Sequence, residues 1–393
     1  MEWKEVDICQ LCDSVSETYK GNASEVVLIN TSDVLDGKCL NHEYVPNKKL
    51  KGQFKKTFRK GDILYSEIRP ANKRFCFVDF EPKDYIASTK LMVLRAHEDV
   101  DPQYLYQILR SNDTLTQLQM LAESRSGTFP QITYSELSNI MVSLPSQKAQ
   151  KNIVSILSSL DRKIELNNKI NADLEEMAQA IFKNWFVDFE PFKDGKFVNS
   201  ELGMIPEGWK VVAFDNILKV TTMKTGKEGI PEYSVTNTGI HPRDEKFTKN
   251  LSKSSAKNKL IRKGNLVFGM SREILNWGIM KEEVGGVSSA YNVYVVDENI
   301  VNSIYLECFI AQRMDYFADL IKPASREGQG VDKALLLKKI ICIPPSEIMD
   351  VFLEKYDSIM HLAEIRKQES SRLSLLRDTL LPRLMSGEIE VPE

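Results

Sequence analysis

The chain has 393 residues, of which 42% are hydrophobic and 27% are charged, and its formal net charge is −3 at pH 7. This is an ordinary composition for a globular protein, and the length indicates two or three domains. A membrane-spanning helix is not expected, because no apolar run approaches the ~20 residues that cross a bilayer. The first ten residues, MEWKEVDICQ, lack the apolar run of a secretion signal. We therefore expect a cytoplasmic protein.

The first 145 residues form a mixed, β-rich region. Short β-branched segments such as Val26–Ile29 are separated by Gly, Pro and Asn. Residues 47–60, NKKLKGQFKKTFRK, contain seven Lys or Arg and no acidic residue. They lead into RKGDILYS at 59–66 and then into the polar loop SEIRPANKRF at 66–75. A basic run of this kind is either a solvated face or a surface that neutralises phosphates.

Pro145 ends this region, and a long helix is predicted from about Ser146 to Trp185. Apolar residues recur along it at alternating spacings of four and three, which is the heptad pattern of a coiled coil. Asn167 and Asn171 lie on the same stripe, where polar residues weaken packing but help to specify register and partner. The helix cannot bury its apolar stripe alone and therefore needs a partner.

The β-rich region and the long helix that follows it are then repeated, about 200 residues later. Trp209 repeats Trp3, RKGNLVFG at 262–269 repeats RKGDILYS, and CIP at 342–344 repeats SLP near residue 145. Because the order of these landmarks is the same in both halves, they indicate a duplicated unit rather than a single chance match.

The duplication predicts an α+β fold with two mixed, β-rich domains and two long helices. A second helix is expected from about Ser346 to Met385, and antiparallel pairing of the two helices, as a coiled coil, would relate the halves by a pseudo-twofold axis. The predicted segments are a first domain, a central helix, a second domain and a C-terminal helix, at residues 1–145, 146–195, 196–345 and 346–393.

The basic residues follow the same repeat. Residues 249–263, KNLSKSSAKNKLIRK, again contain no acidic residue and lead into the second RKG phrase, which the loop MSREILNWG at 270–278 follows. Two matched basic runs in a slightly acidic chain favour nucleic-acid binding, although an ordinary surface hairpin is the alternative for each residue. The predicted DNA-binding residues are Lys48, Lys49, Lys55, Lys56, Arg69, Asn72, Lys73, Arg74, Lys253, Lys257, Lys259, Arg272, Asn276 and Trp277.

Motifs for catalysis and metal binding are weak. The chain has no G-x-x-x-x-G-K-[ST] phosphate loop. Asp79 and Glu81, in VDFEP at 78–82, would fit a fragment of a magnesium-dependent nuclease, but this phrase recurs only at 187–191, away from the repeat spacing. A Cys3His zinc set is also conceivable from the spacing, with buried free thiols as the alternative. Its members would be Cys9, Cys12, Cys39 and His42.

Three stretches carry a resemblance to a known family. They are SGTFPQITYSELSNIMVSLP at 126–145, LGMIPEGWK at 202–210 and the paired RKGD and RKGN phrases. With two β-rich regions that alternate with two similar helices, the whole chain resembles the specificity (S) subunit of type I restriction-modification systems. The second copy departs from the first where Gly328-Gln329-Gly330-Val331 replaces the Gly-Thr-Phe-Pro phrase.

The resemblance implies that each β-rich region is a target-recognition domain that reads one half of a split, asymmetric sequence of double-stranded DNA. The paired helices would set the unread gap. The chain would catalyse nothing and hold no cofactor or metal. Two modification subunits would bind S-adenosylmethionine and methylate adenine at N6, and two restriction subunits would use ATP and Mg²⁺. A pseudo-symmetric scaffold that binds proteins, without DNA specificity, is the alternative.

Overall fold

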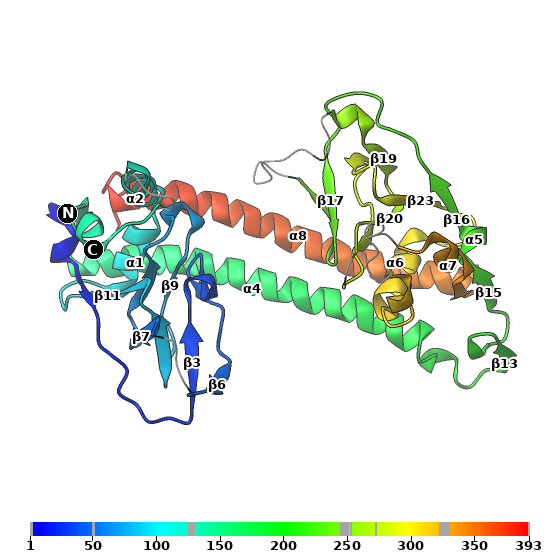
Figure 1. Cartoon of the computed structure of the whole chain (residues 1–393), viewed down its shortest axis with the longest axis horizontal. Helices are drawn as coiled ribbons and strands as arrows, with labels where there is room; N and C mark the ends of the chain where they lie inside the picture. Colours follow the sequence, from blue (N-terminus) through cyan, green and yellow to red (C-terminus); the bar gives the residue numbers. More distant parts are fainter. Residues whose placement is uncertain are drawn as a thin grey trace. The chain divides into compact units, whose positions relative to one another are not determined.

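The computed structural model describes residues 3–48, 52–124, 130–243, 251, 254–271, 273–321 and 331–391. The chain divides into two compact units: unit 1 comprises residues 1–168 and 367–393, and unit 2 comprises residues 169–366. Two helices of 40 residues, α4 (Gln147–Phe186) and α8 (Ser346–Met385), run from one unit into the other (Figure 1). Their bounds match the predicted helices to within one residue, and the predicted α+β fold with two long helices is confirmed.

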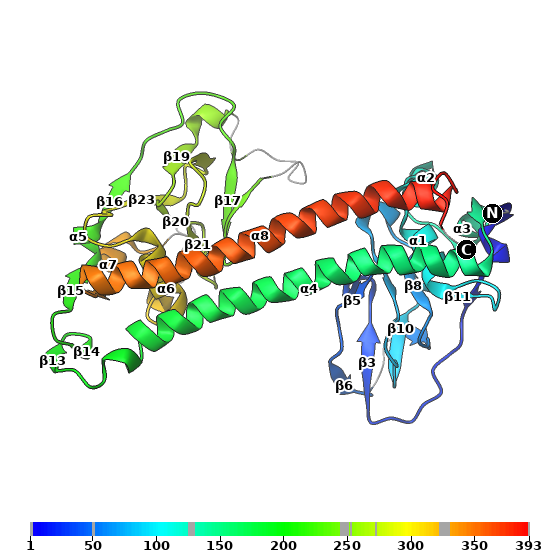
Figure 2. The same cartoon turned by 180° about the vertical axis from the view of Figure 1, so that it is seen from behind.

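Unit 1 contains two four-stranded sheets. The first is antiparallel, with the order β2 (Cys12–Val15), β11 (Leu91–Ala96), β8 (Ile63–Ser66) and β9 (Phe75–Phe77). The second has the order β6 (Tyr44–Pro46), β3 (Glu25–Ile29), β10 (Tyr85–Ser88) and β7 (Phe54–Lys56), with β3 and β10 parallel. Figure 2 shows β3 and β10 next to one another.

Smaller elements complete unit 1. Two short antiparallel pairs are β1 (Lys4–Asp7) with β12 (Met141–Leu144), and β4 (Val34–Leu35) with β5 (Lys38–Cys39). The helices are η1 (Ile8–Gln10), η2 (Thr31–Asp33), η3 (Pro70–Asn72), α1 (Pro102–Arg110), α2 (Asn112–Ser124) and α3 (Tyr134–Ser138). Asp101 shows why α1 begins where it does: its carboxylate accepts the N–H groups of Gln103 and Tyr104, and Pro102 needs no such partner.

Unit 2 repeats the first sheet of unit 1. Its strands have the order β16 (Leu218–Thr221), β23 (Asn292–Val296), β20 (Leu266–Phe268) and β21 (Trp277–Ile279). The two-stranded pairs are β13 (Phe197–Ser200) with β14 (Gly203–Pro206), β15 (Lys210–Ala213) with β24 (Ile340–Ile343), β17 (Tyr233–Thr236) with β18 (Gly239–Pro242), and β19 (Lys259–Arg262) with β22 (Val284–Val287). The helices are η4 (Glu190–Phe192), α5 (Phe214–Ile217), η5 (Ser255–Lys257), α6 (Ser303–Gln312), η6 (Ala318–Leu320) and α7 (Lys333–Lys338).

The duplicated RKG phrase is a turn that starts the third strand of each repeated sheet. In unit 1 the carboxylate of Asp62 accepts the N–H of Arg59 at 2.8 Å, and in unit 2 the side-chain oxygen of Asn265 accepts the N–H of Arg262 at 2.8 Å. The glycine of each phrase has a positive φ, 88° in the first copy and 81° in the second, which a residue with a side chain rarely adopts. The phrase is therefore repeated because the turn geometry is repeated.

The choice of Asp in one copy and Asn in the other has a local electrostatic reason. Asp62 is only 1% exposed, and its two oxygens accept from Nε and Nη2 of Arg95 on β11, both at 2.9 Å. In β23 of unit 2 the equivalent strand position holds Val295, so no cation faces Asn265 from there. A buried carboxylate is stable in unit 1 because it is paired, and the neutral amide forms the same turn without a partner charge.

The two long helices close the core of each unit. In unit 1, Ile153 and Leu157 of α4 share a core with Leu381 and Leu384 of α8. In unit 2, Phe186 of α4 packs against other aromatic rings of the unit, with centroids 4.9 Å from Phe352 of α8 and 5.0 Å from Tyr305 of α6. Among the described residues, no helix combines the length and apolar character needed to cross a membrane.

A double-mutant cycle tests the pairing of Asp62 with Arg95. We expect Asp62→Asn to lower the free energy of unfolding by about 2 kcal/mol, because a mostly buried guanidinium would keep its charge without a carboxylate. Adding Arg95→Val, which reproduces the residues of unit 2, should recover most of that loss. Urea denaturation of both single variants and the double variant measures these differences. A double variant that is less stable than Asp62→Asn alone would contradict this account.

Candidate nucleic-acid interface

The loop between β8 and β9 of unit 1 holds two residues in the left-handed region of backbone space. Arg69 (φ 45°) and Lys73 (φ 51°) flank η3, and neither is glycine. Each such residue costs on the order of 1 kcal/mol, so the conformation persists only where its surroundings impose it. Strain of this kind concentrates at functional sites. Among the described residues of unit 1, the strained non-glycine residues lie closest together in this loop.

Three distant segments impose that conformation. The N–H of Arg69 donates to the carbonyl of Pro130 at 3.1 Å, and the N–H of Ala71 donates to Oε1 of Gln119 on α2 at 3.1 Å. The carbonyl of Lys73 accepts the N–H of Asp36, in the β4–β5 turn, at 2.8 Å. The backbone of the loop is thus held from several sides, while the side chains of Arg69 and Asn72 are exposed. A rigid backbone with free polar side chains is well suited to recognition, because little entropy is lost on binding.

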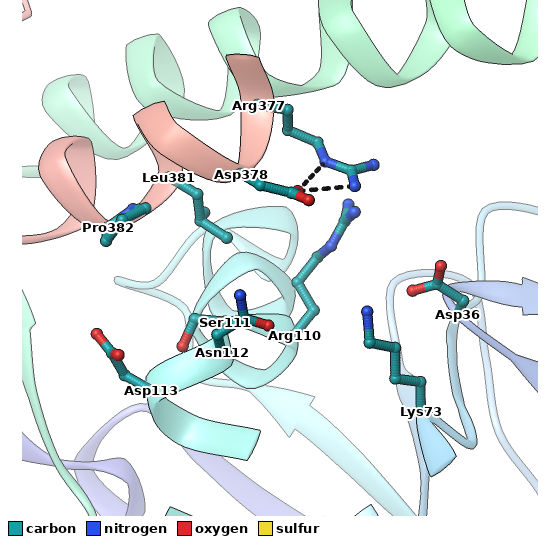
Figure 3. A pocket seen from close by; sticks show the side chains of 10 residues that line it. All are labelled: Asp36, Lys73, Arg110, Ser111, Asn112, Asp113, Arg377, Asp378, Leu381 and Pro382. Carbon is teal, nitrogen blue, oxygen red and sulfur yellow. Dashed lines mark hydrogen bonds and ion pairs between the residues drawn. The ribbon is translucent and has the colours of Figure 1, made fainter. Parts of the chain in front are cut away.

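Lys73 is placed differently from Arg69 and Asn72. It lines a cavity of about 180 Å³ between the η3 loop, the start of α2 and the end of α8. Figure 3 shows Lys73 and Arg110 pointing toward the same space, with Asp36 beside Lys73 and Arg377 paired with Asp378. The charges around this cavity are mixed, so the exposed side chain of Lys73 has both acidic and basic neighbours.

Two other predicted cations of unit 1 have structural partners. Lys56 is half-buried, and its Nζ donates to the carbonyls of Thr89 and Leu91 at 3.2 and 2.8 Å. Burial lowers the pKa of Lys56 from its ordinary value. Nη1 of Arg74 donates to the carbonyls of Ser32 and Val34 at 3.0 and 3.4 Å. These two side chains connect strands and loops within the unit, and their contact with DNA stays a prediction.

Lys48 and Lys55 keep the character expected of phosphate contacts. Both are exposed, and Lys55 lies on β7 next to the structural Lys56. Lys49 lies outside the described residues. The predicted basic run therefore contains side chains of two kinds, which alternate along the strand because neighbouring residues of a strand face opposite sides.

The predicted residues of unit 2 are divided in the same way. Lys257 is exposed, whereas Nζ of Lys259 donates to the carbonyl of Tyr291 and burial lowers the pKa of Lys259. Nδ2 of Asn276 donates to the carbonyl of Met270 at 2.6 Å and so shapes the turn before β21. Lys253 and Arg272 lie outside the described residues.

Trp277, which was also predicted as a DNA contact, differs from the exposed residues of that set. The side chain is 8% exposed and belongs to the main apolar core of unit 2. It cannot stack on a base without leaving that core, where an aromatic side chain of this size contributes several kcal/mol to stability.

Sequence reasoning missed two polar residues beside the η3 loop. Nζ of Lys90 lies 3.4 Å from Oε1 of Gln131 and 3.4 Å from a carboxylate oxygen of Glu67. Gln131 forms an isolated bridge with Ile68, directly before Arg69. Gln131 belongs to the FPQI part of the 126–145 stretch, which the sequence does mark. Only the fold shows that this stretch lies next to the η3 loop.

The conceivable metal sites do not assemble. Among the residues that the structure describes, no group of three or more His, Cys, Asp or Glu side chains is arranged to hold a metal ion. Sγ of Cys12 donates instead to the carbonyl of Ile8 at 3.8 Å, and Nδ1 of His42 lies 2.9 Å from the hydroxyl of Tyr85. The zinc set of Cys9, Cys12, Cys39 and His42 and the nuclease pair of Asp79 and Glu81 therefore have no geometric support.

Comparison with known proteins decides the family. Residues 2–176 match the family described as type I restriction modification DNA specificity domain. The chain is also 31% identical to the type I restriction enzyme HindI specificity subunit of Haemophilus influenzae, over 99% of this chain and 100% of that protein. The chain belongs to the family of type I restriction enzyme specificity subunits.

More distant likenesses agree with this assignment. The MjaIX specificity subunit of Methanocaldococcus jannaschii is 26% identical over 90% of this chain and 85% of its own length. A solved chain from a study of complex assembly and conformational transition in a type I R-M system aligns over 98% of both chains, with a TM-score of 0.53 and 17% identity. The type I S subunit from M. genitalium gives a TM-score of 0.50 at 13% identity over 100% of this chain and 97% of that one. The two structural likenesses show a shared fold.

The neighbouring residues Lys55 and Lys56 provide a matched test of how this specificity subunit uses its basic run. We expect Lys56→Ala to lower the free energy of unfolding by about 1–2 kcal/mol, because two partly buried carbonyls lose a charged donor. Lys55→Ala should change it by less than about 0.5 kcal/mol, because the side chain is exposed. Urea denaturation of the two variants gives the comparison. Equal losses in both variants would show that the two side chains are not divided as described.

Proposed function

We propose that this chain reads a split sequence of double-stranded DNA for a type I restriction-modification complex, with one half-site read by each unit. The observation that carries the proposal is the duplicated frame. Both units have the same four-strand sheet order and the same turn before the third strand, but the loops after that strand differ. One frame with two different loops suits a target whose two halves have different sequences.

In unit 1 the reading residues we propose are Arg69 and Asn72. Arg forms two hydrogen bonds with O6 and N7 of guanine, and Asn forms two with N6 and N7 of adenine, so both can identify a base in the major groove. Lys48 and Lys55 would bind phosphates and position the unit without reading sequence. Gln131 and Lys90, which adjoin the loop, extend the same polar surface.

In unit 2 the corresponding loop lies between β20 and β21. Its described residues form no 3-10 helix, and the contacts of Asn276 hold its end close to Met270. The exposed Lys257 of η5 is the phosphate contact that we propose for this unit. Because the loop differs in its side chains from that of unit 1, we expect unit 2 to read a different half-site.

We assign the chemistry of the complex to partner subunits. Two modification subunits would bind S-adenosylmethionine and methylate adenine at N6, after turning the base out of the helix. Two restriction subunits would supply the cleavage that depends on ATP and Mg²⁺. This chain would contribute the choice of site and hold those subunits there.

A map of methylated adenines tests the proposed function. We expect genomic DNA from cells that make this chain with its modification subunit to show a split motif that is absent when the chain is omitted. Arg69→Ala and Asn72→Ala should each alter one half of that motif and leave the other half unchanged. An active modification subunit whose motif does not depend on this chain would favour the protein-binding scaffold instead.

Lys55→Ala is the matched control for those two variants. It should weaken binding to all duplexes alike and reduce the slope of log affinity against log salt by about 1, because one phosphate contact is lost. The motif itself should stay the same. A changed motif in this variant would mean that Lys55 reads a base.

The length of the helices offers a second test. We propose that α4 and α8 set the unread gap, because both run from one unit into the other. Inserting seven residues after position 168 and seven after position 366 adds about 10 Å of helix and keeps the heptad pattern. We expect a gap longer by about three base pairs, with both half-sites retained.

The matched control is the same insertion in one helix only. It should put the two apolar stripes out of register and remove methylation at the split motif. The gap hypothesis fails if the double insertion is active at the original spacing. Both variants are compared by the methylation map and by circular dichroism, which confirms that the helices form.

A further inference from the structure

Two thiols of unit 1 lie side by side where the β4–β5 hairpin packs on β9. Cys39 is the last residue of β5, and Cys76 is the middle residue of β9. The two segments are joined by backbone hydrogen bonds, from the N–H of Gly37 to the carbonyl of Phe75 at 3.0 Å and from the N–H of Phe77 to the carbonyl of Gly37 at 3.3 Å. Gly37 of the hairpin forms an isolated bridge with Cys76, and Cys39 packs against the apolar cluster to which Cys76 belongs.

Access to the two thiols is unequal. Cys76 is fully buried in an apolar cluster, whereas Cys39 is partly exposed. Cys39 lines an open cavity of about 540 Å³, which Lys38, His42 and Asp79 also line. A small polar oxidant can therefore reach Cys39 from solvent, whereas Cys76 is shielded within the apolar cluster against which Cys39 packs.

We propose that Cys39 and Cys76 are an oxidation site that forms a reversible disulfide on reaction with a peroxide. Sγ of Cys39, as the thiolate, attacks one oxygen of hydrogen peroxide, the O–O bond breaks, and the leaving hydroxide takes a proton to become water. Sγ of Cys76 then attacks the resulting sulfenic sulfur, and the second hydroxide leaves with the proton of Cys76 as water. Two thiols are oxidised by two electrons and the peroxide is reduced to two waters.

The surroundings assign the two roles. Interaction with the thiol of Cys76 holds the pKa of Cys39 below its ordinary value, although burial opposes this effect. The same interaction, together with burial, raises the pKa of Cys76 well above its ordinary value. Because the thiolate is the nucleophile, Cys39 reacts first and Cys76 resolves the product.

The consequence for DNA reading rests on the proposed function. Cys76 follows the η3 loop by a few residues, and the hairpin that carries Cys39 also holds Lys73 through the N–H of Asp36. A disulfide would join two segments that already touch, so the loop should keep its conformation. Further oxidation of Cys39 to a sulfinate would instead place a fixed charge at this packing contact. The resolving thiol thus protects the reading loop.

Peptide mapping without reduction tests the site independently of DNA. The full chain is treated with hydrogen peroxide, blocked with N-ethylmaleimide, digested and analysed by mass spectrometry. We expect a Cys39–Cys76 cross-linked peptide that dithiothreitol removes. The exposed Cys9 serves as the internal measure of peroxide dose. Absence of the cross-link at a dose that oxidises Cys9 would overturn the proposal.

Two variants separate the roles of the thiols. In Cys76→Ser, dimedone should trap a sulfenic acid at Cys39, and higher doses should give the sulfinate. In Cys39→Ser, Cys76 should stay reduced at a dose that oxidises Cys9, because it is buried. Oxidation of Cys76 at the same rate in this variant would contradict the order of reaction.

Thermal unfolding gives a second readout that does not depend on the modification subunit. Closing the loop between residues 39 and 76 restricts the unfolded chain, so the oxidised wild type should unfold about 5 °C higher than the reduced form. The shift should vanish in Cys39→Ser and Cys76→Ser and on reduction. A lowered transition temperature in the oxidised wild type would mean that the disulfide distorts the fold, and it would overturn the proposal.

Discussion

One carboxylate, that of Asp161, joins three helices of unit 1. It lies on α4 and accepts from Arg110 of α1 and from Arg377 of α8, both at 2.8 Å. The side chain of Arg110 is only 9% exposed, and its guanidinium lies over the ring of Tyr106 at 5.3 Å. These charges are largely removed from water, so each requires the others. The two ion pairs connect α8, near the end of the chain, to α1 and α4. Unit 1 therefore cannot form all of its contacts until α8 has packed against it.

In unit 2, α4 and α8 are held together by apolar packing instead of ion pairs. There the two helix segments meet through Phe186 and Phe352, with Tyr305 of α6 against both. Edge-to-face rings of this kind bury much surface and need no polar partner. The ion pairs of Asp161 in unit 1 specify one helix geometry because their hydrogen bonds are directional. The contact of Phe186 with Phe352 in unit 2 contributes mainly buried apolar area.

The loop proposed to read DNA in each unit depends on the turn that precedes the third strand of the repeated sheet. Asp62 and Asn265 form the same turn in the two units, and the loop that follows is free to differ. In unit 1 it is held in a left-handed conformation at Arg69 and Lys73, and in unit 2 it closes through Asn276. Separation of a constant turn from a variable loop would let one fold present the two unlike reading surfaces that we propose.

The sequence by itself determined the architecture. Heptad spacing and the repeated landmarks were sufficient to predict two long helices and a duplicated α+β unit, because periodicity and turn chemistry are local properties of a chain. The roles of individual basic residues could not be predicted from their neighbours in the sequence. Lys55 and Lys56 are neighbours in one basic run, yet one is solvated and the other donates to the carbonyls of Thr89 and Leu91, more than thirty residues away in the chain. Trp277 looks like a stacking residue in its loop and is a core residue in its sheet. Only the tertiary structure decided these cases, since burial and hydrogen-bond partners depend on segments that meet after folding.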